Sequence, residues 1–95
     1  MGPTAAVVTE ELITDEQLLA IDALLSKLAG QIIRTRKGRV WSLWIDERPL
    51  DVSATDPHTV TLAAGLNSSQ DYDMLRELGQ RLADLLGGSM TEPTK

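Results

Sequence analysis

The hydrophobic pattern of this chain changes its period near Gly30, and that change restricts the fold more than any other feature. Over residues 15–28 the apolar side chains recur at spacings of three and four, which is typical of an amphipathic helix. Thr14 and Gln17 form a capping box before this helix, and Gly30 tolerates the left-handed conformation at its end. From Gln31 the period is two, which indicates strands. We therefore expect helix and sheet to share one core.

The remaining segments supply more strands and a second helix. Ser68 is a suitable N-cap and Gly87 a suitable C-terminal stop, and leucines between them form an apolar stripe. Two amphipathic helices need a sheet face to cover, so we expect an α+β two-layer sandwich, in which two helices pack on one face of a small, mainly antiparallel sheet of about four strands. The expected order is β-α-β-β-(β)-β-α, with strands over residues 4–9, 31–36, 39–46, 50–53 and 59–66.

Length and composition fit one small globular domain. The 95 residues carry a formal net charge of -5 with 42% hydrophobic side chains, which suits a folded, acidic protein. We expect residues 1–88 to form a single α+β domain and residues 89–95 a flexible C-terminal tail. The absence of cysteine, of a signal-peptide pattern and of a long apolar run favours a cytoplasmic protein outside the membrane. The excess of Ala and Arg over Lys is typical of a high-GC bacterial genome.

A cluster of cations marks a hairpin in the middle of the chain, and its register decides which way the cations point. If 37–38 alone were the loop, the arginines before it would lie over the core. A three-residue loop, 36–38, instead places Ile33 on the core face and turns the cations away, so we expect this register. The face away from the helices, which we call the open face, should then carry Arg34, Arg36, Val40, Ser42, Trp44 and, from a later strand, Thr61.

The cation cluster, which also includes Arg39, allows three interpretations. It is either a solvated hairpin tip, a surface for a protein partner or a second copy, or a grip for phosphates with Trp44 stacking on a base. The acidic net charge, the scarcity of aromatic residues and the lack of a known nucleic-acid motif disfavour the last. Trp44 itself is either a binding anchor, since tryptophan is enriched at hot spots, or a ring covered by Arg34 or Arg36.

No residue pattern indicates catalysis, a cofactor or a metal. His58 is the only histidine and stands beside Asp56 and Pro57, where an exposed turn residue is far more common than a general base. No ligands follow a recognised metal spacing. The segment before the second helix lacks the glycines and lysine of a phosphate-binding loop, and Asp71 and Asp73 at its start suit capping instead.

The expected function is therefore binding rather than catalysis. We expect a protein-binding module that acts through the open face and the hairpin, with an inhibitor or immunity-type protein acting on a basic partner as the leading example. Trp44 would anchor the contact and exposed acids, Asp71 among them, would steer it. The alternative is a homodimeric structural or accessory subunit that associates through the same face. A small ligand-binding or nucleic-acid-binding domain ranks below both.

Overall fold

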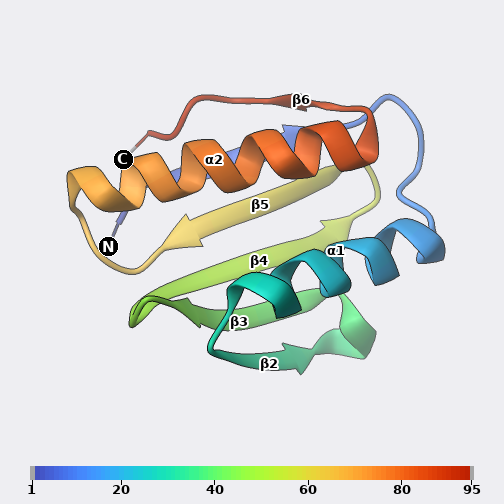
Figure 1. Cartoon of the computed structure of the whole chain (residues 1–95). Coiled ribbons are helices and arrows are strands. Elements are labelled where there is room, and N and C mark those ends of the chain that lie inside the picture. Colours follow the sequence, from blue (N-terminus) through green and yellow to red (C-terminus); the bar gives the residue numbers. More distant parts are fainter. Residues whose placement is uncertain (1, 95) are drawn as a thin grey trace.

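The computed structural model describes residues 2–94 and consists of one sheet with two helices. The sheet order is β2-β3-β4-β5-β1-β6, and all neighbouring strands are antiparallel. Both helices lie on the same face of the sheet (Figure 1). The predicted α+β class is confirmed, although the sheet has six strands instead of about four. The elements are β1 (Thr4–Val8), α1 (Asp15–Leu28), β2 (Gln31–Thr35), β3 (Val40–Ile45), β4 (Arg48–Asp56), β5 (Thr59–Ala64), α2 (Ser69–Leu86) and β6 (Ser89–Met90), with a 3-10 turn (Arg36–Gly38) between β2 and β3.

Helix α1 begins where the sequence predicts and ends differently. The Thr14 hydroxyl accepts from the backbone N–H of Gln17 at 3.1 Å, and the Gln17 side chain accepts from the N–H of Thr14 at 2.8 Å. This reciprocal pair satisfies two donors that the first turn leaves free. At the other end Ala29 is extended, and Gly30 donates its N–H to the Trp44 carbonyl at 3.1 Å. The chain therefore passes directly into β2 without a left-handed glycine.

Helix α2 has the predicted caps. The Ser68 hydroxyl accepts from the N–H of Asp71, and Gly87 takes the left-handed conformation with φ 67°. Gly79 is buried in the middle of the helix, where a Cβ atom would collide with the Met90 side chain. The glycine therefore lets β6 pass close to α2, which explains its place in a helix despite its low propensity. Neither helix among residues 2–94 is long and apolar enough to cross a membrane.

The hairpin between β2 and β3 has a register that differs from the expected one. Thr35 pairs with Val40 and Arg34 with Trp41, so the connection holds four residues instead of three. Because Trp41 is completely buried under the helices, Arg34 also lies on the helix-covered face and Ile33 lies on the open face. The prediction of which β2 side chains face the helices was wrong, because the register is shifted by one residue. The same prediction for β3 is confirmed.

Two local features stabilise this register. Ile32 takes the place predicted for Ile33 and packs against the core, so an apolar side chain still faces the helices. Arg34 reaches α1 instead of the open face, where its guanidinium binds the Asp22 carboxylate and donates to the Ser26 hydroxyl at 2.8 Å. A cation on the covered face is tolerated because β2 is the edge strand and a carboxylate lies within reach.

We expected residues 89–95 to form a flexible tail, but residues 89–94 are hydrogen-bonded to the sheet. Thr91 donates its N–H to the Ala6 carbonyl at 2.8 Å, and Thr94 exchanges two backbone hydrogen bonds with Thr4, at 2.7 and 2.9 Å. This segment therefore covers one edge of β1. Because most of these contacts are made by main-chain atoms, they leave little trace in the hydrophobic pattern.

Candidate binding surfaces

The open face is a broad polar surface built by alternate residues of the strands. No element among residues 2–94 covers it, since both helices lie on the other side (Figure 1). Short hydroxyl side chains dominate its central strands, which suits contact with water. Across the sheet, three of its side-chain rows are Gln31, Trp44 and Pro49; Ile33, Ser42, Asp51, Ala63 and Thr4; and Thr35, Val40, Ser53, Thr61 and Ala6.

Trp44 is the largest side chain on the open face and is partly exposed. It lies between Gln31 and Pro49 on the neighbouring strands. Ile33 is diagonal to Trp44 and to Val40, a spacing at which large side chains still interact. Ile33 is 47% exposed, so this corner of the sheet offers apolar area around Ser42. We call Ile33, Val40 and Trp44 the apolar corner.

The predicted site residues fall into three groups. Ser42 and Thr61 lie on the open face with Trp44, and the Ser42 hydroxyl donates to Asp51 at 2.9 Å. Arg34 lies on the opposite face, so it cannot cover Trp44. Arg36 and Arg39 lie in the β2–β3 connection, next to the open-face pair Thr35 and Val40. Of these two, Arg39 is partly buried and donates to the Ala54 carbonyl at 3.2 Å. The binding roles of these residues stay predictions.

Asp22 connects Arg34 to the core in a way that sequence reasoning missed. The buried indole N–H of Trp41 donates to the Asp22 carboxylate at 3.0 Å, which satisfies the one polar group of that ring. The hydrogen bond from Arg34 lowers the pKa of Asp22 below its ordinary value of 3.8; partial burial opposes this shift and the Trp41 hydrogen bond adds to it. The helical pattern places Asp22 outside the apolar stripe of α1. No sequence motif indicates that it would contact Arg34 on β2 or Trp41 on β3.

We expect Asp22→Asn to lower the free energy of unfolding at neutral pH. The difference between wild type and variant should shrink in acid. A lowered pKa in the folded state means that folding favours the carboxylate, so the stabilisation is complete well above pH 3.8 and is lost as the pH falls through the lower folded value. Urea unfolding of wild type and variant from pH 7 to about pH 3 measures the difference. Arg34→Gln should follow the same trend and Arg36→Gln should not. A constant gap between wild type and Asp22→Asn would contradict this.

The two hairpin turns that flank β3 carry opposite charges. Arg36 and Lys37 form the basic turn, with φ angles of 50° and 58°, and Asp46 and Glu47 form the acidic turn, with φ angles of 50° and 65°. Left-handed backbone is costly for residues with a Cβ atom, on the order of 1 kcal/mol each. Glycine, asparagine or aspartate is the ordinary choice at such turns, so Arg36, Lys37 and Glu47 take this conformation at some expense of stability.

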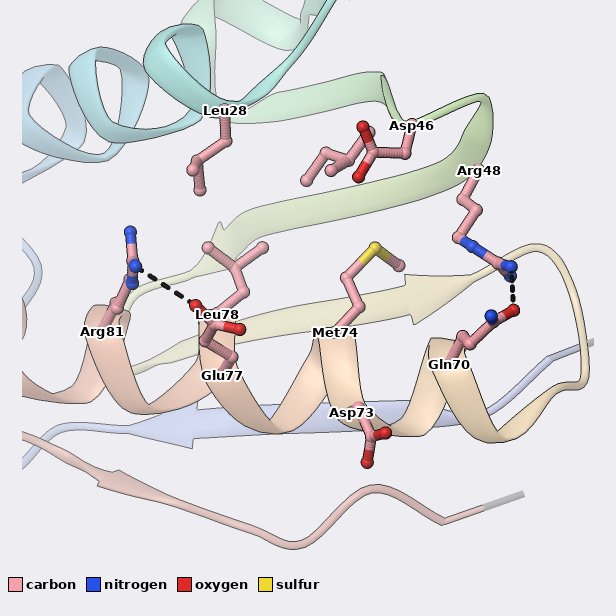
Figure 2. A pocket seen from close by; sticks show the side chains of 10 residues that line it. Leu28, Asp46, Arg48, Gln70, Asp73, Met74, Glu77, Leu78 and Arg81 are labelled. Carbon is pink, nitrogen blue, oxygen red and sulfur yellow. Dashed lines mark hydrogen bonds and ion pairs between the residues drawn. The ribbon is translucent and has the colours of Figure 1, made fainter.

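A groove between the helices is a second surface that the sequence did not predict. It measures about 620 Å³ and lies over the ends of β3 and β4. Figure 2 shows Leu28 of α1 facing Leu78 and Met74 of α2 across it. Both cations on its rim are already paired: Arg48 binds Gln70, and Arg81 binds Glu77 at 3.1 Å (Figure 2). Arg48 also binds Asp71. The groove therefore has a small apolar centre bordered by polar and charged side chains, and both of its arginines are bound within the chain.

Asp71 anchors the rim of this groove and is completely buried. Its carboxylate binds Arg48 at 2.7 Å and accepts from the backbone N–H of Leu66 at 3.0 Å. The expected role of Asp71 in steering a partner is therefore wrong, because a buried and paired charge does not face solvent. Its real partners, on β4 and the loop before α2, are 23 and five residues away in sequence.

His58 occupies a turn, as its neighbours in sequence suggest. Its backbone N–H donates to the Asp56 carboxylate at 2.8 Å, which is the pattern of an Asx turn, and its carbonyl accepts from Thr9 at 2.8 Å. Within residues 2–94 no group of three or more histidine, aspartate or glutamate side chains is placed to hold a metal ion.

Comparison of the chain with protein-family models, with curated proteins and with solved structures found no match. What the protein does must therefore be inferred from its surfaces.

Proposed function

We propose that the chain is a small acidic protein-binding module that acts through the open face, without catalysis. One observation carries this proposal: a sheet face uncovered by any element of residues 2–94 holds a partly exposed tryptophan beside the 47%-exposed Ile33. Large apolar side chains grouped on a surface are typical of interaction sites, and tryptophan is the residue most enriched at hot spots.

The rest of the open face suits a reversible contact. Ser42, Thr61 and neighbouring hydroxyl groups can form hydrogen bonds around an apolar centre, which matches the polar rim of ordinary interfaces. Arg36 is exposed in the basic turn, directly after Thr35 of this face. The net charge of -5 would favour encounter with a basic partner, as in an inhibitor or immunity-type protein.

Trp44→Ala is expected to weaken capture of a protein partner by tenfold or more while the fold persists, because a hot-spot side chain contributes about 2 kcal/mol or more. Immobilised wild type and Trp44→Ala would be compared for the proteins they retain from the source cells. Leu19→Ala is the matched control, since Leu19 is 72% exposed on α1, on the opposite side of the molecule. If both variants lost the captured partner to the same extent, the proposal would be contradicted.

The alternative occupant of the same face is a second copy of the chain. Acrylamide quenching of Trp44 fluorescence, in a Trp41→Phe background, separates the two readings. Quenching that falls as the protein is concentrated would favour self-association through the open face. Quenching that stays high would leave that face free for a different protein.

A further inference from the structure

The two edges of the sheet differ sharply. At one edge, β6 has only two residues, and the chain beyond it continues along β1. At the other edge, β2 has five residues, and within residues 2–94 no strand pairs with its outer side. Such an edge presents unpaired backbone N–H and carbonyl groups that can bind another strand.

The usual protections against strand addition are weak on β2. It contains no proline, and its five residues pair with β3 without a bulge. Its one charged side chain, Arg34, is directed to the helix layer and neutralised by Asp22. Ile33, at the middle of the strand, is 47% exposed. An edge with these properties is suited to pairing.

The charges beside β2 indicate which strand would pair with it, and in which direction. The basic turn, Arg36 and Lys37, follows the C-terminal end of β2, and the acidic turn, Asp46 and Glu47, lies beside its N-terminal end. The two turns are at opposite ends of β3 (Figure 1). An antiparallel second β2 would bring the basic turn of each copy beside the acidic turn of the other. A parallel one would bring like charges together.

We propose that a second copy of this chain pairs antiparallel with β2 through a two-fold axis at Ile33, which joins the two sheets into one. The surface is then self-complementary, as a two-fold interface requires. The two Ile33 side chains would cover each other on the open face. Asp46, at the β3 side of each acidic turn, would lie two strand spacings from the β2 side of the other copy's basic turn, about 10 Å between backbones, which the long side chain of Arg36 can bridge.

This proposal does not depend on the proposed function. It uses the edge of the sheet and shares only Ile33 with the partner surface, so the dimer would carry two open faces side by side, each still presenting Trp44. Each copy has a net charge of -5, which opposes association. The local match of basic and acidic turns must therefore decide the outcome, and that match can be reversed by substitution.

A charge exchange between the two turns tests the proposal. Sedimentation equilibrium, from micromolar to millimolar protein, would be measured for wild type, for Arg36→Glu/Lys37→Glu and for Asp46→Lys/Glu47→Lys. We expect wild type to dimerise and each variant alone to dimerise at least tenfold more weakly, because like charges then face each other. An equal mixture of the two variants should regain the wild-type dissociation constant, since both contacts in the mixed dimer are again opposite in sign.

A second pair of variants tests the strand itself and does not touch the turns. Ile33→Lys should abolish the dimer, because two cations would face each other at the axis. Val8→Lys is the control, because Val8 is 46% exposed on β1, which is four strands away from β2 in the sheet. Thermal unfolding by circular dichroism checks that each variant is folded. If the turn variants do not fold, Ile33→Lys decides alone.

Three results would overturn the proposal. The first is a wild type that stays monomeric at the highest concentration. The second is a mixture of the turn variants, both folded, that remains as weak as each variant alone. The third is a dimer that Trp44→Ala dissociates and Ile33→Lys leaves intact, because that result would assign self-association to the centre of the open face.

Discussion

Asp71→Ala is expected to lower the free energy of unfolding by about 3 kcal/mol, the low end of the range for breaking one partner of a buried ion pair. The Asp71 side chain is fully buried and binds Arg48 at 2.7 Å. The substitution would remove the only carboxylate that binds Arg48, leaving it the neutral acceptors Ser68 and Gln70, and would leave the backbone N–H of Leu66 without its acceptor. We expect the low end because the Arg48 side chain keeps 25% of its exposure and can turn toward water.

Asp73→Ala is the matched control for this prediction. Asp73 is two residues further along α2, and its side chain is 76% exposed in an ion pair with Arg76 at 3.2 Å. Surface pairs of this kind contribute about 0.5 kcal/mol or less, so the variant should unfold nearly as the wild type does. Urea unfolding at neutral pH measures all three proteins. If Asp71→Ala lost no more than Asp73→Ala, the buried network would not be a source of stability.

Trp41→Ala is expected to cost about 3 to 5 kcal/mol, the usual range for removing a large aromatic side chain from a core. Trp41 is fully buried, with its indole N–H bound to Asp22 at 3.0 Å. Trp41→Phe should cost less, because it keeps most of the buried area and loses mainly the hydrogen bond. Asp22 then retains Arg34 as a partner, so its charge stays compensated.

Trp44→Ala should cost only about 1 kcal/mol, because Trp44 is partly exposed on the open face. The two substitutions delete the same side chain from the same strand, so their difference measures which face is buried. Unfolding should be followed by circular dichroism, since each variant loses a fluorophore. If Trp44→Ala were as costly as Trp41→Ala, something would cover the open face, and the proposed binding surface would not be free.

The accuracy of the sequence predictions varied with the local signal. Both helices began at their predicted caps, because the capping groups lie within three residues of each other in sequence. On β3 the alternation from Trp41 to Ile45 determined the buried face, so Trp44 lies on the open face as expected. On β2, Ile32 and Ile33 are adjacent, and either phase of the strand buries one isoleucine. The pattern therefore could not choose the register, and Arg34 was assigned to the wrong face.

The missed features all depend on residues that are distant in sequence. Arg34 and Asp22 are 12 residues apart, and Arg48 and Asp71 are 23 apart. The groove of about 620 Å³ exists only where the two helices meet the ends of β3 and β4. The pairing of residues 89–94 with β1 uses mainly main-chain atoms, which carry no residue-specific signal.

By itself the sequence determined the class of fold, the caps of both helices and the buried face of β3, because hydrophobic periodicity and capping are short-range properties of neighbouring residues. Only the tertiary structure decided the register of β2, the burial of Asp71 and the placement of opposite charges at the two ends of β3. Those features follow from which strands and helices become neighbours in space, and the favourable partner for an edge residue or a buried charge is set by that arrangement.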